Sequence, residues 1–110
     1  MDCLFCKIIA GEIPSTKVYE DGQIYAFRDI SPIAPVHVLV VPKKHIESAA
    51  GVTPDDAGLM GQIWTKIPEI AKALGCGQFR VTANAGPDAG QTVFHLHFHI
   101  IGGRKLEGMG

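Results

Sequence analysis

Three histidines at alternate positions form the segment of this 110-residue sequence that is best suited to chemistry. Within Phe94–Ile101, single apolar residues separate His95, His97 and His99. Because successive side chains of a strand point to opposite faces, an extended segment places the three imidazoles on one face and the apolar side chains on the other. Near pH 7 an imidazole can act as a nucleophile, as a general acid or base, or as a metal ligand.

The spacing of the three histidines argues against one metal ion held by all of them. Alternate residues of a strand lie about 6.6 Å apart, and the outer pair, His95 and His99, would lie about 13 Å apart. Since a Zn–N bond is only about 2 Å long, two neighbouring imidazoles can share a zinc ion but the outer pair is poorly placed. Catalysis, with a different task for each histidine, is the favoured interpretation, and a solvated polar strand face is the alternative.

A glycine-rich loop, Ala85–Val93, directly precedes the histidines. Glycines allow backbone N–H groups to approach an anion closely. Asn84 and Thr92 add side-chain donors at the two ends of the loop. By itself such a loop could be an ordinary turn, but its position before three histidines predicts a cradle for a phosphoryl group.

The remaining elements follow from hydrophobic periodicity and turn residues. Apolar residues recur every three or four positions after Thr53-Pro54, which predicts one long helix ending at Gly75. Asp21-Gly22 between two apolar runs predicts a hairpin. The other expected elements are a short helix at Cys3–Ala10, hairpin strands at Thr16–Glu20 and Gln23–Arg28, a loop at Asp29–Pro35, and strands at His37–Pro42, Gln78–Asn84 and Phe94–Ile101. This order predicts an α+β fold, an antiparallel five-stranded sheet with helices packed on one face.

Composition excludes several classes of protein. Ten Lys and Arg residues against eleven Asp and Glu give a net charge of −1, so no basic excess indicates a nucleic-acid partner. No apolar run approaches the roughly 18–20 residues that cross a bilayer, so no membrane partner is expected. The first residues lack the features of a secretory signal, and three cysteines are too few for a disulfide scaffold, so we expect a cytoplasmic protein. The length fits one domain spanning residues 1–110.

Seven consecutive residues, His95-Leu96-His97-Phe98-His99-Ile100-Ile101, match the His-φ-His-φ-His-φ-φ motif of the histidine triad (HIT) superfamily. The resemblance spans nearly the whole chain and includes Phe5–Ile9, Tyr25–Pro32, Ala34–His37, Pro42–Ile46 and Gly90–His95. The Gly102-Gly103-Arg104 ending resembles the Hint branch, the nucleoside phosphoramidases. The transferase branches carry Gln where this chain has His99, so the resemblance implies hydrolysis.

The resemblance implies a role for each catalytic residue. His97 would attack the α-phosphorus and form a nucleotidyl-histidine intermediate, His37 would lie against this nucleophile, and His99 would assist the departing amine. The phosphoryl oxygens would be bound by two side chains and by the amides of one loop segment: Asn84, Gly90, Gln91, Thr92 and Val93. Asp29 would hold the ribose hydroxyls, although a turn residue is the alternative. The purine slot would consist of Leu4, Phe5, Ile8, Ile13 and Ile30, for which an ordinary core is the alternative.

The implied activity is hydrolysis of a nucleoside 5′-phosphoramidate at its P–N bond, which releases a purine nucleoside monophosphate. A dinucleoside polyphosphate hydrolase would use the same site. A zinc-binding module that senses nucleotides or interacts with partners, with incidental turnover, is an alternative from another class. No organic cofactor is expected.

The first residues contain Cys3-Leu4-Phe5-Cys6, a CxxC motif without a second copy. Two thiolates need two further ligands to hold a structural zinc ion. Two buried thiols without a metal and a redox pair are the alternatives. Some histidine triad proteins, especially bacterial ones, bind zinc through two Cys and two His. The resemblance therefore implies a site made of Cys3, Cys6, His45 and His95, which leaves His97 and His99 for chemistry.

The resemblance also implies a homodimer in which two five-stranded sheets join into one of ten strands. The long helix and the strand Gln78–Asn84 would form the interface. Trp64 and Ile67 are candidate contact residues, for which a place in the core is the alternative. Many Hint proteins continue past Gly-Gly-Arg into an aromatic tail that reaches the partner's site. Here Lys105–Gly110 contains no aromatic residue, so the leaving-group preference cannot be carried over.

Overall fold

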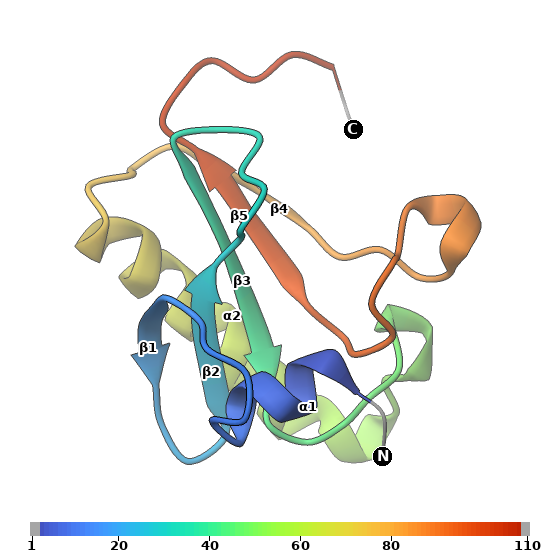
Figure 1. Cartoon of the computed structure of the whole chain (residues 1–110). Coiled ribbons are helices and arrows are strands. Elements are labelled where there is room, and N and C mark those ends of the chain that lie inside the picture. Colours follow the sequence, from blue (N-terminus) through green and yellow to red (C-terminus); the bar gives the residue numbers. More distant parts are fainter. Residues whose placement is uncertain (1–2, 109–110) are drawn as a thin grey trace.

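The structure is a computed structural model, and it describes residues 3–108; the first two and last two residues of the predicted domain lie outside this range. Figure 1 shows the arrangement of the elements. The helices and strands are α1 (Leu4–Ile9), β1 (Lys17–Glu20), β2 (Ile24–Arg28), β3 (Val36–Pro42), α2 (Ala57–Ala73), β4 (Phe79–Thr82) and β5 (Phe98–Gly102), with 3-10 turns at Ala49–Gly51, Pro54–Asp56 and Pro87–Ala89. No helix in residues 3–108 is long and apolar enough to cross a membrane.

The five strands form one antiparallel sheet, as the sequence predicts, and the structure adds their order, β1-β2-β3-β5-β4. The hairpin between β1 and β2 turns at Asp21, whose carboxylate accepts the N–H groups of Gln23 and Ile24, both at 2.8 Å. At the other end of the order, β4 pairs only with β5, so β4 forms an edge of the sheet. The α+β fold class is therefore confirmed.

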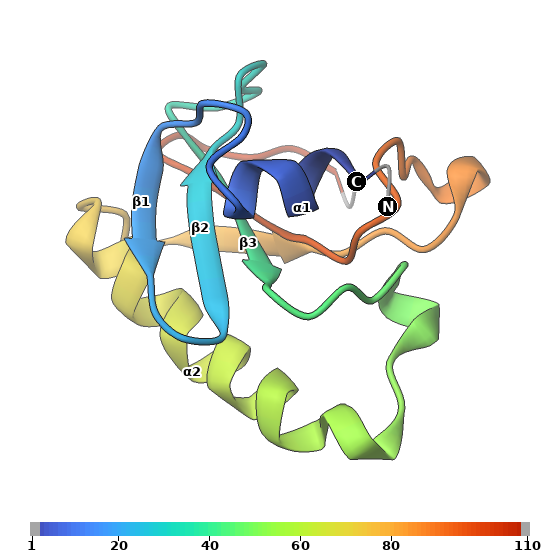
Figure 2. The same cartoon turned by 60° about the horizontal axis from the view of Figure 1, so that its bottom comes forward.

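The two helices lie on opposite faces of the sheet, whereas the sequence analysis expected both on one face (Figures 1 and 2). In β3, Val38 and Val40 belong to the core cluster that contains the buried residues of α2. Leu39 and Val41 belong to a second cluster, which contains the buried residues of α1. Because successive residues of β3 point to opposite faces and Val38–Pro42 are all apolar, this part of the strand must be covered on both sides.

Strand β5 begins at Phe98, four residues later than predicted. Its ladder with β3 starts where Phe98 pairs with Val40. Beyond that point the ladder does not continue, because Pro42 has no N–H and its carbonyl oxygen accepts the ring N–H of His95 at 2.8 Å. The alternation nevertheless holds, since Leu96 is buried in the same cluster as Phe98. Phe94, predicted on this apolar face, is instead exposed.

Helix α2 is held by its N-terminal turn and by an apolar face. Thr53 and Asp56 form a reciprocal capping box in the turn that leads into the helix. Ile67 is buried in the core, so it is not available as an interface residue. The ring of Trp64 is half exposed and packs edge-on against Phe98, with centroids 5.9 Å apart.

Gly102 lies where β5 approaches the turn before β4. A Cβ atom at this position would lie 2.5 Å from Cys76 Sγ and 2.7 Å from the Gln78 carbonyl oxygen. We predict that Gly102→Ala lowers the free energy of unfolding by about 1–3 kcal/mol, because the backbone must move to admit the methyl group. Urea denaturation measures this change. Gly77→Ala is the control, since nothing lies within 4 Å of its added Cβ; equal losses in both variants would contradict the steric argument.

Candidate active site and metal centre

A cavity of about 340 Å³ lies between α1, the Asp29–Ser31 loop and the segment that carries the histidines. Its volume is within the range of small-molecule binding sites. His97 and His99 both line it, together with Asp29 and Thr92. The full lining is Leu4, Phe5, Ile8, Phe27, Asp29, Ile30, Ser31, Leu39, Thr92, Val93, His97 and His99. The cavity thus joins an apolar wall to a cluster of imidazoles.

His97 is held in one tautomer. Its Nδ1–H donates to the backbone carbonyl of His95 at 2.7 Å, so Nε2 keeps its lone pair. The ring also packs edge-on against Phe5, with centroids 5.0 Å apart. Burial is the main reason that the pKa of His97 lies below its ordinary value of 6.5. His97 is therefore a neutral, oriented imidazole, which is the form that can act as a nucleophile.

His37 and His99 form a hydrogen-bonded pair in which each proton can be placed. The backbone N–H of Ile33 donates to His37 Nδ1 at 3.2 Å, so the proton of the neutral His37 ring is on Nε2. His37 Nε2 donates in turn to His99 Nδ1 at 2.9 Å. The proton of His99 is consequently on Nε2. The expectation that His37 lies against the nucleophile needs correction, because His37 bonds to His99. His99 in turn meets the His97 ring edge-on, with ring centroids 4.9 Å apart.

Asp29 lies beside this pair. One carboxylate oxygen accepts the backbone N–H of Ser31 at 2.8 Å, and the other is 3.4 Å from His37 Nε2. Asp29, His37 and His99 each offer a ligand atom within 4.8 Å of the others, a spacing that a metal ion could bridge. A metal on His37 Nε2 would displace its proton to Nδ1, where it would face the N–H of Ile33. In the observed arrangement the proton between His37 Nε2 and His99 Nδ1 occupies the place that such a metal would need.

Hydrogen bonds of the Gln91 side chain and of the loop backbone stabilise the glycine-rich loop. The Gln91 side chain is buried and satisfied: Oε1 accepts the N–H of Gly86, and Nε2 donates to the carbonyls of Glu47 and Val93, at 2.8 to 3.0 Å. The backbone N–H groups of Gly90 and Gln91 donate to Pro87 and Gly86 inside the loop. Gln91 therefore holds the loop against the chain that follows β3.

These bonds correct the predicted set of phosphate ligands. The backbone N–H groups of Gly90 and Gln91 already donate hydrogen bonds inside the loop. Of the predicted phosphate donors, Thr92 and Val93 line the cavity. Asn84 does not line the cavity; its Nδ2 lies 3.7 Å from the position of a Cβ built on Gly90. The sequence analysis missed the structural role of the Gln91 side chain. One of its three hydrogen bonds is to Glu47, which is distant in the sequence and could not be paired with it from the local pattern.

Four of the five residues predicted to form a purine slot line this cavity. Leu4, Phe5, Ile8 and Ile30 line the cavity, and the side chain of Ile30 is almost fully exposed at its edge. Ile13 does not line it but packs, half buried, against the core cluster of α1. Phe27, Ser31 and Leu39 also line the cavity and were missed. Alternation along β2 and β3 would have identified Phe27 and Leu39, had α1 been placed on the correct face.

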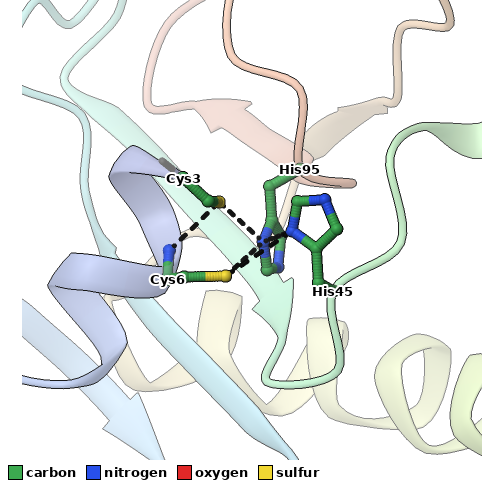
Figure 3. Close-up of side chains that lie close together, drawn as sticks. All are labelled: Cys3, Cys6, His45 and His95. Carbon is green, nitrogen blue, oxygen red and sulfur yellow. Dashed lines mark hydrogen bonds between the residues drawn. The ribbon is translucent and has the colours of Figure 1, made fainter. Parts of the chain in front are cut away.

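The four predicted metal ligands converge on one point (Figure 3). His95 Nδ1 lies 3.3 Å from Cys3 Sγ, 3.5 Å from Cys6 Sγ and 3.1 Å from His45 Nδ1, and Cys6 Sγ lies 3.5 Å from His45 Nδ1. Tetrahedral zinc with ordinary bond lengths separates two nitrogens by about 3.4 Å and nitrogen from sulfur by about 3.6 Å. The observed separations are close to the edges of such a tetrahedron.

The protonation of the four side chains is also compatible with metal binding. Because His95 Nε2–H donates to the Pro42 carbonyl, Nδ1 faces the two sulfurs with a lone pair. Burial, followed by the neighbouring Cys3, raises the pKa of the Cys6 thiol to about 11, so a metal that binds here displaces thiol protons. The donor set of two sulfurs and two imidazole nitrogens is typical of structural zinc sites.

The geometry of both sites can now be compared with known proteins. The family model for the HIT domain matches residues 10–106. The chain belongs to the HIT domain family. Protein HitA of Neisseria gonorrhoeae is 50% identical over 102 residues, which are 92% of this chain and 95% of that protein.

Solved structures agree in fold across the whole chain. A HIT family hydrolase from Legionella pneumophila has a TM-score of 0.94 at 45% identity, covering 96% of both chains. A histidine triad protein from Clostridium difficile has the same TM-score at 50% identity, covering 100% of this chain and 97% of that one. These HIT relatives support a hydrolase.

The His99 ring gives a measurable electrostatic signature. Burial, followed by the charges of His97 and His37, lowers the pKa of His99 to about 4. We predict that His99 stays neutral as the pH falls through 6.5, and that His37→Gln raises its pKa by removing one of these causes. Ring chemical shifts in an NMR titration measure both values. A His99 that titrates near 6.5 in the unmodified protein would contradict the assignment.

The same shift has a consequence for stability. A histidine whose pKa is lower in the folded than in the unfolded chain binds fewer protons when folded. Its contribution to stability is fully present above about pH 6.5 and is lost progressively as the pH falls towards 4.

Proposed function

We propose that this HIT family member hydrolyses nucleoside 5′-phosphoramidates, cleaving the P–N bond at the α-phosphate and releasing a purine nucleoside monophosphate. The observation that carries the proposal is the fixed tautomer of His97, which leaves a lone pair on Nε2 of a ring that lines the cavity. The apolar wall suits a base, and Asp29 at the same cavity offers acceptors for ribose hydroxyls.

In the first step, His97 Nε2 forms a bond to the α-phosphorus and the bond from phosphorus to the amine breaks. The developing charge on the phosphoryl oxygens is met by the Thr92 hydroxyl and by the amides of Thr92 and Val93. The departing amine needs one added proton, and the anionic substrate favours its uptake by the His37–His99 pair because an opposite charge raises a histidine pKa. The added proton would sit on His37 Nδ1, which then no longer accepts the Ile33 N–H, and the Nε2 proton of His37 would pass to His99 Nδ1 as His99 gives up its own. His99 then donates its Nε2 proton to the departing nitrogen.

In the second step, His99 Nε2, now without its proton, accepts a proton from a water molecule. The water oxygen forms a bond to phosphorus, the bond between phosphorus and His97 Nε2 breaks, and the lone pair returns to His97. The nucleoside monophosphate leaves. The Nδ1–H of His97 stays on the His95 carbonyl throughout, so the ring is ready for another cycle.

Trapping the intermediate tests this mechanism. We predict that His99→Gln lowers kcat for adenosine 5′-phosphoramidate by about 10²–10⁴-fold, since general acid–base assistance is worth that much. Mass spectrometry of the slowed variant should find an AMP adduct on the peptide that contains His97. His97→Ala should form no adduct and should lose turnover.

Other outcomes separate the competing functions. An unchanged rate in His97→Ala would refute the nucleophile. If the unmodified protein binds AMP but turns over no phosphoramidate, the nucleotide-sensing function is supported instead. A much higher kcat/KM for dinucleoside polyphosphates would support the related polyphosphate hydrolase.

We also propose that Cys3, Cys6, His45 and His95 hold a structural zinc ion. When bound, the ion would link α1 to the catalytic segment and supply folding energy rather than chemistry. The support is the near-tetrahedral spacing of the four donor atoms and the lone pair on His95 Nδ1.

Metal analysis tests the zinc proposal. Protein purified without chelators should contain about one zinc per chain, as a four-ligand structural site requires. The double variant Cys3→Ala/Cys6→Ala should contain none, whereas Cys76→Ala, which alters the remaining cysteine, should retain it. Zinc-free wild-type protein would contradict the proposal.

Finally, we propose a homodimer that pairs the edge strands β4 into a ten-stranded sheet. The support is that β4 has a neighbour on one side only and that Trp64 is half exposed. Sedimentation equilibrium should give about twice the chain mass of 11.8 kDa. Trp64→Asp should weaken this association, and a monomer at micromolar concentration would contradict it.

A further inference from the structure

We infer that His95 couples the metal centre to the nucleophile: metal ligation by its side chain fixes its backbone carbonyl, and that carbonyl fixes the tautomer of His97. His95 would thus be a positioning residue, which acts on the reaction through His97. The inference deepens the proposed function and rests on the proposed zinc ion.

Three groups of His95, namely Nδ1, Nε2–H and the backbone carbonyl, each have a different partner. Its Nδ1 faces the donor atoms of Cys3, Cys6 and His45. Its Nε2–H donates to Pro42, and its carbonyl oxygen accepts the Nδ1–H of His97 at 2.7 Å. His95 has no exposed surface, so water cannot replace any of these partners.

The backbone around His95 is not fixed by the sheet. Strand β5 begins only at Phe98, and the turn before it includes His95 itself. Among the described residues, one backbone hydrogen bond ties this segment to its neighbours: Leu96 N–H to the Ile46 carbonyl, at 2.6 Å. Anchoring the His95 side chain therefore takes the place of the ladder bonds that hold His99.

The effect on His97 follows from its two tautomers. With Nδ1–H bound to the His95 carbonyl, Nε2 presents a lone pair to the cavity. If the carbonyl turns away, the proton can move to Nε2, and the ring then presents a donor that cannot attack phosphorus. Without a metal, His95 Nδ1 would keep contacts of 3.3 to 3.5 Å to thiols, which are weak donors, and one of 3.1 Å to His45 Nδ1, while Nε2–H would keep its bond to Pro42. These contacts hold the ring less firmly than four bonds to one metal ion would.

Loss of the metal would also loosen α1, because Cys3 caps this helix and Cys6 belongs to it. A loosened α1 weakens nucleotide binding, since Phe5 and Ile8 line the cavity. If His95 couples the metal to His97, loss of the metal should also change the His97 tautomer and lower the rate of the chemical step. These two readouts separate positioning of the nucleophile from a purely structural role.

The experiment compares His45→Ala with His45→Cys, because both remove the same ring and only the second keeps four ligands. His45 Nδ1 contacts Cys6 Sγ and His95 Nδ1 rather than the His95 carbonyl, so the metal is the intended variable. The measurements are zinc content, AMP affinity, the His97 tautomer by ¹H–¹⁵N NMR of the imidazole nitrogens, and the single-turnover rate with adenosine 5′-phosphoramidate.

We expect zinc and a protonated Nδ1 on His97 in the wild type and in His45→Cys, and a single-turnover rate in His45→Cys that is closer to the wild-type rate than that of His45→Ala. In His45→Ala we expect no zinc, a mixture of His97 tautomers and a single-turnover rate lowered about 10–100-fold, the usual effect of losing a supporting shell. If His45→Ala does not fold, reversible removal of zinc from the wild type by a chelator, with the fold followed by circular dichroism, gives the same comparison.

Each remaining outcome is decisive. A zinc-free but folded protein that keeps the single His97 tautomer and its single-turnover rate would overturn the coupling, even if AMP affinity falls. Absence of zinc from the wild type would overturn the zinc proposal and the coupling with it. A metal-dependent tautomer in a protein that turns over no phosphoramidate would uphold the coupling and refute the proposed function.

Discussion

The hydrogen bond from His97 Nδ1 to the His95 carbonyl is the contact on which the chemistry of this fold depends. An imidazole has two nitrogens of similar basicity, and without a fixed acceptor either can carry the proton. A backbone carbonyl has no choice of role, because it can only accept. A main-chain atom in the segment before β5 therefore decides which nitrogen of the central histidine carries the lone pair.

The same logic distinguishes the other histidines, which the sequence presents as equivalent. The Ile33 amide can only donate, so it sets the tautomer of His37 and, through it, that of His99. The Pro42 carbonyl can only accept, so it directs Nδ1 of His95 towards the cysteines. The histidines thus differ in role because each is hydrogen-bonded to a different backbone group, which either donates or accepts.

Much of the fold and of the site could be predicted from local pattern. Period-two alternation from Leu96 to Ile100 places the histidines opposite the apolar side chains, and this holds even where no regular strand forms. The resemblance to histidine triad proteins supplied the four ligands that converge in Figure 3. These predictions succeed because they need only the chain direction and the alternation of side chains.

The errors concern contacts between segments distant in the sequence. An apolar run such as Val38–Pro42 of β3 indicates burial on both faces, but it does not say which helix covers which face. Helix α1 was therefore misplaced, and Phe27 and Leu39 were missed. The roles of Gly90 and Gln91 depend on a buried amide that reaches the Glu47 carbonyl, 44 positions away.

The short connection after β3 links the catalytic segment, the glycine-rich loop and the predicted metal ligands. The chain between Pro42 and Glu47 contacts the catalytic segment through two backbone carbonyls, those of Pro42 and Ile46, and contacts the loop through a third, that of Glu47. His45 lies within this stretch and faces His95. A short connection after β3 therefore supports the nucleophile, the loop and the proposed metal together, so a displacement of this connection would disturb all three at once.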